Sequence, residues 1–188
     1  MKRSLGPDTL AYPTPVFIVG SYDREGRPNI MAVAWGGLCS SKPPSIAVSM
    51  REATYTHGNI VHSQAFTVNI PSAGQAKQAD YTGIYSGRKV DKFAATGLTP
   101  VKSDLVNAPY IAEFPLVLEC RLSHTFNLGL HTQFVGEIMD VKADEAILDA
   151  DGTISVEKLE PIIFAPGKGA YYRVGAFLGQ AFSIGKQV

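Results

Sequence analysis

Short segments of β-branched and aromatic residues dominate the first half of the chain. Residues 16–22 (VFIVGSY) and 29–35 (NIMAVAW) flank the polar sequence Asp23-Arg24-Glu25-Gly26, which predicts a β-hairpin. A tight Gly36-Gly37 passage then leads into a predicted loop over residues 39–44 (CSSKPP). The next strand, over residues 45–50, alternates between Ile, Val and Met on one face and Ala and Ser on the other.

The rest of the chain continues this pattern, with few long helical segments. Further strands are predicted over residues 66–70, 116–124, 134–141 and 162–164, and residues 171–172 could extend the last of them. A short helix is predicted after Arg51, with Thr54 or Thr56 as its N-cap, and residues 75–85 and 90–95 fit helix or loop. We therefore expect a mainly β protein, a small β-barrel with helical insertions, in which residues 1–188 form one domain.

Composition narrows the classes of partner. Lys plus Arg and Asp plus Glu each number 17, so the formal net charge is zero. This balance argues against a nucleic-acid binder that acts through bulk positive charge, and it leaves little attraction to an anionic membrane. No stretch resembles a transmembrane helix or a signal peptide, and the two cysteines, Cys39 and Cys120, form no CxxC pair. We expect a reduced, cytoplasmic protein.

Several familiar site motifs are absent from the sequence. The four histidines lack the spacings of a zinc site, so no metal is expected. Gly167-Lys168-Gly169 begins like a dinucleotide fingerprint but lacks the third glycine.

The most informative stretch runs from residue 29 to residue 59. The small residues Ala32-Val33-Ala34 precede the only tryptophan, Trp35, and small side chains let a flat aromatic ligand approach backbone N–H groups. Arg51 follows the next strand, and hydroxyl residues stand at the start of the predicted helix: Thr54, Tyr55 and Thr56. An arginine beside hydroxyls and free helix N–H groups is a good phosphate site. The residues thus suggest an elongated ligand with an aromatic end and a phosphate end, although a surface arginine and a capping threonine are common without any ligand.

These residues also resemble a known family. Residues 26–35 (GRPNIMAVAW), 39–44 (CSSKPP) and 48–51 (VSMR) are similar to the flavin reductase-like proteins, which have the FMN-binding split-barrel fold. The similarity continues in the same order through residues 66–71, 91–93, 97–99, 128–131, 136–138 and 172–186, so it spans nearly the whole chain. Within the family, the flavoredoxins are the subgroup that the sequence most resembles.

The resemblance implies a homodimer with noncovalent FMN near the subunit interface. It implies that the isoalloxazine ring and ribityl chain lie along residues matching Ala32, Val33, Ala34, Trp35, Cys39, Ser40 and Ser41. It implies that the phosphate lies near Ser49, Arg51, Thr54, Tyr55 and Thr56, and that Lys89 and Lys92 contact either the phosphate or the partner subunit. His131 matches a histidine on the reactive side of the flavin, where a nicotinamide would stack.

The resemblance leaves the reaction open. Many relatives reduce flavin with NADH or NADPH, whereas flavoredoxin-like members keep FMN and pass electrons between proteins. The resulting expectation is an FMN-dependent oxidoreductase, with a non-catalytic FMN carrier as the alternative.

Individual residues have plainer interpretations as well. Trp35 could be a core or interface residue, and His131 a hydrogen-bonded interface histidine. Cys39 is expected to be a small buried residue beside the ring rather than a redox thiol, because no second cysteine is near it in sequence. Lys89 and Lys92 lie in a mixed-charge stretch, which is usually a solvated face.

Overall fold

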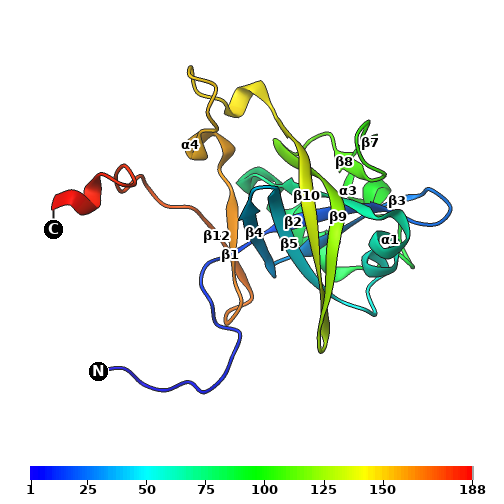
Figure 1. Ribbon diagram of the computed structural model, residues 1–188, viewed down its shortest axis with the longest axis horizontal. Helices are drawn as coiled ribbons and strands as arrows, with labels where there is room; N and C mark the ends of the chain where they lie inside the picture. The colour runs from blue at the N-terminus through cyan, green and yellow to red at the C-terminus, as the bar shows by residue number, and fades with distance from the viewer. Residues whose placement is uncertain (188) are drawn as a thin grey trace.

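A seven-stranded antiparallel sheet forms most of the molecule (Figure 1). The computed structural model describes residues 1–187. In spatial order the strands of this sheet are β3 (Pro28–Val33), β2 (Phe17–Tyr22), β6 (Ala65–Ile70), β9 (Leu116–Leu128), β10 (His131–Ala143), β5 (Pro44–Arg51) and β4 (Gly36–Ser41).

The two edge strands of this sheet meet, which curls the sheet into a barrel. β3 and β4 lie at opposite edges, yet only Ala34 and Trp35 separate them along the chain. The backbone carbonyl of Trp35 accepts a hydrogen bond of 2.7 Å from the amide of Ser49 on β5. We call residues 34–35, with their contact to β5, the seam. The sheet therefore has the predicted mainly β, barrel-like architecture.

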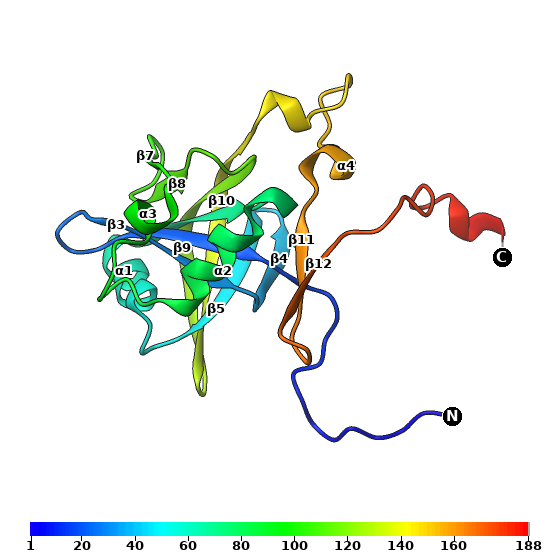
Figure 2. The ribbon, with the colours of Figure 1, turned by 180° about the vertical axis from the view of Figure 1, so that it is seen from behind.

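Two smaller sheets flank the barrel. One has the order β1 (Thr14–Pro15), β11 (Ile162–Ala165) and β12 (Ala170–Arg173), and the other pairs β7 (Pro100–Lys102) with β8 (Pro109–Ile111). The α-helices are α1 (Tyr55–Ser63), α2 (Ala76–Ile84), α3 (Lys92–Thr96) and α4 (Val156–Leu159). Short 3-10 turns occur at η1 (Ala73–Gln75), η2 (Glu145–Ile147) and η3 (Ile184–Gln187). Figure 2 shows α2 and α3 on the face opposite to that of Figure 1.

Two hydrophobic cores follow from the alternation along the strands. One core fills the barrel and includes Val33, Val48 and Phe134. The other lies where β2 and β3 meet the helices, and it includes Ile30 and Phe93. Successive residues of β3 therefore face different cores, which positions this strand between the barrel interior and α2.

The start of α1 has the predicted cap. The Thr54 hydroxyl accepts a hydrogen bond of 3.4 Å from the amide of His57 and donates one of 2.9 Å to the carbonyl of Arg51. Of the two predicted candidates, Thr54 is therefore the N-cap, whereas Thr56 lies inside the helix and is buried. The hydroxyl fixes both the helix start and the turn that leaves β5.

The structure differs from the sequence predictions at three segments. Residues 39–41, predicted as a loop, belong to β4, and Cys39 is exposed rather than buried. The strand predicted over 29–35 ends at Val33. Residues 171–172 do not extend β11 but form a separate strand, β12, that pairs with it in antiparallel register. Strand β4 was not predicted because an exposed edge strand has no buried face, and its sequence therefore has no alternation of apolar and polar residues.

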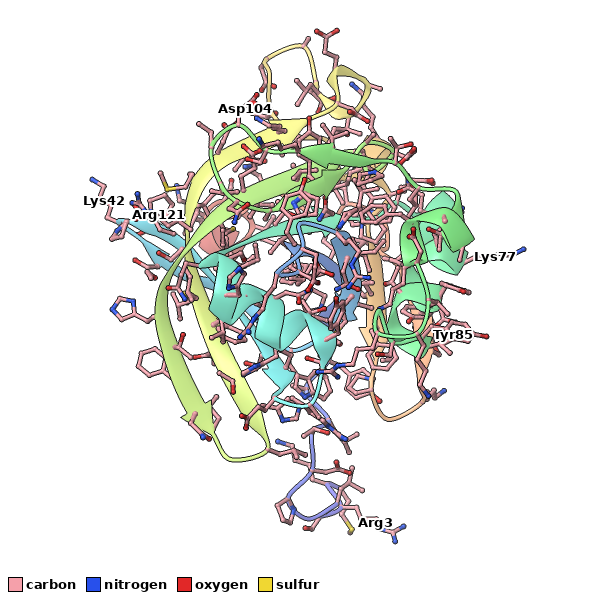
Figure 3. The ribbon with its side chains drawn as sticks, turned by 90° about the vertical axis from the view of Figure 1, so that its right-hand side faces the viewer. Arg3, Lys42, Lys77, Tyr85, Asp104 and Arg121 are labelled. Atoms are coloured by element: carbon pink, nitrogen blue, oxygen red, sulfur yellow. The ribbon has the colours of Figure 1, made fainter. Side chains whose placement is uncertain are left out.

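The hairpin of β9 and β10 is longer than predicted. Each strand has 13 residues, and the end of the hairpin extends beyond the barrel (Figure 3). Within residues 1–187 no helix is long and apolar enough to span a membrane.

Candidate functional site

A cavity of about 260 Å³ opens where β3, β5 and three helices approach one another. We call it the Lys92 cavity. Its walls come from Met31 on β3, Arg51 at the end of β5, the start of α1, the end of α2, the loop after α2 and Lys92 at the start of α3. The residues that line it are Met31, Arg51, Ala53, Thr54, Tyr55, Thr56, Thr82, Gly83, Ile84, Tyr85, Ser86, Gly87 and Lys92. Five of the residues predicted near a phosphate thus come together in one cavity.

Lys92 is buried, which is unusual for a lysine side chain. It is only 4% exposed, and its Nζ donates hydrogen bonds to the carbonyls of Ile30 (2.8 Å) and Thr82 (2.6 Å). No carboxylate among the described residues forms an ion pair with it, and burial lowers the pKa of Lys92 to about 8. A buried ammonium group without an acidic partner is costly unless an anion compensates it. The solvated position expected from the mixed-charge sequence is therefore wrong for Lys92.

Arg51 and the start of α1 supply further groups suited to an anion. Arg51 is exposed, and its guanidinium makes no hydrogen bond or ion pair with another residue of the described chain. The first amides of an α-helix have no intrahelical acceptor, so the amides of Tyr55 and Thr56 are available. The Thr54 hydroxyl is occupied by its capping bonds, and the Thr56 hydroxyl accepts a bond of 2.9 Å from Asn29. The backbone and Arg51, rather than the hydroxyls, are the free donors.

A hydrogen-bonded network fixes the Tyr55 wall of the cavity. The Tyr55 hydroxyl donates a hydrogen bond of 2.6 Å to Asp23, which also accepts one of 2.7 Å from Arg27. Burial acts to raise the pKa of Asp23, but hydrogen bonds from Tyr55, Arg27 and the Glu25 amide outweigh it and lower this pKa to about 2. The guanidinium of Arg88 lies 5.5 Å from the centre of the Tyr55 ring. The sequence pattern predicts only a turn at Asp23 and does not reveal this network.

The loop after α2 approaches the cavity closely because it contains Gly87. A Cβ atom at Gly87 would overlap the side-chain oxygen of Asn29 and lie 2.8 Å from Cδ1 of Tyr55. A second cavity, of about 290 Å³, borders the same loop and shares Tyr55, Gly87 and Lys92 with the first. Lys89 lines this neighbouring cavity and not the Lys92 cavity.

His131 lies at the same end of the sheet as Arg51. The two residues are register partners across β10 and β5, and His131 is partly buried. A different histidine, His57, contacts the core side of this hairpin, where its Nε2 lies 3.0 Å from the hydroxyl of Thr132. Burial lowers the pKa of His57, although Glu52 acts to raise it. His131 is thus the histidine beside Arg51.

The residues predicted along an aromatic ring are distributed over the seam and the outer edge of the barrel. Ala34 and Trp35 lie at the seam, where the carbonyl of Trp35 accepts a hydrogen bond from Ser49. Ser49 was predicted near the phosphate, but it does not line the Lys92 cavity. Cys39, Ser40 and Ser41 lie on the exposed strand β4 and do not line the Lys92 cavity. The other predicted contacts have buried surroundings. Ala32 packs beside Gly83 of α2, and Val33 belongs to the barrel core. Val33 is therefore buried, whereas Ala32 is half-buried.

The sequence and the fold match a known family. A model of the flavin reductase like domain matches residues 9–169. The chain belongs to the flavin reductase-like family. The resemblance inferred from the sequence and the predicted split-barrel fold class are both confirmed.

Solved structures of similar proteins agree with this assignment. The chain is 57% identical to the flavoredoxin of Desulfovibrio vulgaris (Miyazaki F), with a TM-score of 0.95 over 98% of this chain and 100% of that one. It is 32% identical to the flavoredoxin from Methanosarcina acetivorans, with a TM-score of 0.93 over 100% and 98% of the two chains. An FMN-binding protein from Thermus thermophilus, solved with bound 1-cyclohex-2-enone, is 26% identical, with a TM-score of 0.79 over 95% and 99%.

Proposed function

We propose that this flavin reductase-like protein is an FMN-dependent oxidoreductase that holds FMN noncovalently, with the phosphate in the Lys92 cavity. The observation that carries the proposal is the buried ammonium group of Lys92, which lines the cavity and has no acidic partner among the described residues. A phosphate dianion would compensate that charge. Among the parts of a flavin nucleotide, only the phosphate carries this charge.

The other donors at the cavity fit the same phosphate. The guanidinium of Arg51 can donate two parallel charge-assisted hydrogen bonds to phosphate oxygens. The free amides at the start of α1, those of Tyr55 and Thr56, add backbone donors where the helix dipole favours negative charge. Lys89 is proposed as a weaker contact at the rim, because it lines only the neighbouring cavity.

The Lys92 cavity is too small to enclose a whole FMN molecule. At about 260 Å³ the cavity is smaller than pockets that enclose a whole drug-sized ligand, which span roughly 300–1,000 Å³. We therefore assign only the phosphate end to it. The ribityl chain and ring extend along the seam, past Ala34, Trp35 and Ser49, toward Cys39, Ser40 and Ser41 on β4. We propose that backbone N–H groups on the free edge of the β3 segment that contains Ala32 and Val33 are the ring donors.

The protein's own role in the reaction is positional and electrostatic. When bound, the flavin supplies hydride and electron transfer. Arg51 and Lys92 hold the phosphate, and the Tyr55–Asp23 bond keeps the adjoining wall in place. His131, opposite Arg51, is proposed to face the reactive side of the ring, where it contacts a nicotinamide or donates a proton.

We further propose that the protein is a homodimer with the flavin near the subunit interface. The exposed strand β4 at the edge of the sheet supports the homodimer. We also propose that the protein works in the reducing cytoplasm, because Cys39 and Cys120 are both free cysteines. The electron donor is NADH, NADPH or a reduced redox protein.

Anaerobic stopped-flow reduction of the FMN-loaded protein tests the reaction. Each donor is mixed with the loaded protein, and flavin absorbance is followed. Fast reduction by NADH or NADPH assigns a flavin reductase, whereas slow reduction by both with fast reduction by a protein donor assigns electron transfer between proteins. No reduction by any of them would overturn the oxidoreductase proposal and leave the FMN carrier.

A further inference from the structure

Arg88 joins the loop between α2 and α3 to the segment that begins α1. This loop, residues 85–91, passes beside the start of α1 (Figure 2). A guanidinium nitrogen of Arg88 donates a hydrogen bond of 2.7 Å to the backbone carbonyl of Ala53. The guanidinium carbon lies 5.5 Å from the centre of the Tyr55 ring. We call these two contacts the latch, because together they fasten the loop to the start of α1.

The latch crosses the boundary between the two neighbouring cavities. Ala53 lines the Lys92 cavity and not the second cavity, whereas Arg88 lines the second cavity and not the Lys92 cavity. The two cavities share Tyr55, Gly87 and Lys92. The hydrogen bond from Arg88 to Ala53 therefore stands on the path from one cavity to the other.

Both ends of the latch are held by local structure. The amides of Lys89 and Val90 donate hydrogen bonds of 2.9 and 3.2 Å to the carbonyl of Ser86, so Arg88 lies within a tight turn. Ala53 directly precedes the N-cap of α1, which fixes the direction of its carbonyl. The latch is thus a contact between two ordered segments, although Arg88 itself is exposed.

The two common flavin nucleotides differ at their phosphates. The phosphate of FMN is a terminal monoester, which carries up to about two negative charges at pH 7. In FAD the same phosphate continues into a second phosphate and an adenosine, and neither phosphate of that link is a dianion. FAD therefore compensates a buried ammonium group less well than FMN does. It also needs space beyond the first phosphate, and the second cavity, of about 290 Å³, is the neighbouring space.

We propose that the latch makes Arg88 a residue that determines specificity, by favouring FMN over FAD. The closed latch leaves the Lys92 cavity open to a terminal phosphate and obstructs the continuation into the second cavity. FAD therefore has to break the latch in order to bind, whereas FMN does not. The inference rests on the proposed function, because it takes the flavin phosphate to lie in the Lys92 cavity.

Fluorescence titration of FMN and FAD into the apoproteins tests the selectivity. Arg88→Ala removes the latch. Arg24→Ala is the matched control, because Arg24 is an exposed arginine between β2 and β3 that lines neither cavity. Wild type and control should bind FMN more tightly than FAD by at least about tenfold, the lower end of the effect of one hydrogen bond to a charged group. Arg88→Ala should bind FAD about tenfold more tightly than wild type does, with FMN nearly unchanged.

Three results of that titration would overturn the proposal. One is an FMN:FAD affinity ratio that Arg88→Ala leaves unchanged. Another is an equal change of the ratio in Arg24→Ala. The third is a ratio that falls only because FMN binds more weakly, since Arg88 would then act through its charge on the phosphate and not by closing the path.

The monomethyl ester of FMN separates closure from charge. Its phosphate is a diester and no dianion, like each phosphate of FAD, but it adds only a methyl group beyond the phosphate. It should bind more weakly than FMN, and by the same factor in wild type and in Arg88→Ala, because its phosphate does not continue into the second cavity. Equal gains for this ester and for FAD in Arg88→Ala would overturn the closure of the path.

Hydrogen exchange in the absence of any flavin tests the latch itself. The amides of Lys89 and Val90 should exchange faster in the apoprotein of Arg88→Ala than in wild type or Arg24→Ala, because a loop released from α1 opens more often. Equal exchange in all three proteins would overturn the latch.

The titration also distinguishes the inference from the proposed function. A wild type that binds no FMN would overturn the proposed function and the selectivity with it. Tight binding of FMN by all three proteins, with one common FMN:FAD ratio, would overturn the selectivity alone and keep the proposed function.

Discussion

Arg51 and His131 face each other across neighbouring strands, although they lie far apart in the sequence. Arg51 ends β5 beside the Lys92 cavity, and His131 begins β10 where the long hairpin turns back. The register of these two strands therefore places the arginine that we propose for the phosphate and the histidine that we propose for the reactive side of the flavin at the same end of the barrel. In the proposed function, one pair of strands thus carries both contacts.

Arg51→Ala should weaken FMN binding and leave riboflavin binding nearly unchanged. A hydrogen bond between charged groups contributes about 1.5–3 kcal/mol, which corresponds to roughly 10- to 150-fold in Kd. Fluorescence titration of both ligands into both apoproteins measures the effect. Arg121→Ala is the control, because Arg121 is an exposed arginine on β9 that pairs with Glu137 instead. Equal losses for FMN and riboflavin would mean that Arg51 supports the fold or the ring pocket.

Binding of FMN should weaken as the pH rises above about 8. Burial lowers the pKa of Lys92 to about 8 in the free protein, and a bound phosphate dianion would raise it again. Above pH 8 binding must then take up a proton, so the affinity should fall by about tenfold per pH unit. Riboflavin, which has no phosphate, should show no such dependence. An FMN affinity that stays constant from pH 7 to 9.5 would remove Lys92 from the phosphate site.

The Asp23 network should stabilise the fold in a pH-dependent way. The pKa of Asp23 is lowered from 3.8 to about 2, so the ionised carboxylate stabilises the folded state above pH 3.8. Asp23→Asn should lower the free energy of unfolding at pH 7 by about 2 kcal/mol, measured by urea denaturation. That difference should shrink as the pH falls from about 4 to 2. Asp104→Asn, at an exposed carboxylate between β7 and β8, should differ little from wild type at any pH.

His131→Gln should slow the reduction of bound flavin without weakening FMN binding. A positioned proton donor typically contributes 10²- to 10⁴-fold to a rate, so we expect a loss of about 100-fold or more in stopped-flow reduction by a nicotinamide donor. His57→Gln is the matched control, because His57 contacts Thr132 on the core side of the same hairpin. If both variants are reduced at the wild-type rate, His131 is an interface residue rather than a catalytic one.

The sequence predicted the elements whose alternation comes from burial on one face. Strands β5 and β6 and the Thr54 cap of α1 follow from that pattern and from capping chemistry. It did not predict β4, because an exposed edge strand of Gly, Cys and Ser carries no periodic signal.

The candidate site was likewise only partly visible in the sequence. Residues close in sequence, Arg51 to Thr56, could be grouped from spacing and from the family resemblance. The burial of Lys92 and its bonds to Ile30 and Thr82 arise from packing between β3, α2 and α3, which spacing does not reveal. The bond from Tyr55 to Asp23 joins the start of α1 to the turn between β2 and β3, and it was missed for the same reason.

Identification of the chromophore carried by the purified protein tests the central claim most directly. The protein should be yellow, and the chromophore released by heating should co-elute with FMN on chromatography, in a ratio near one per chain. Release without a covalent remnant should leave an apoprotein that binds added FMN again. A colourless protein that also fails to bind added FMN would contradict the account of the Lys92 cavity as a flavin phosphate site.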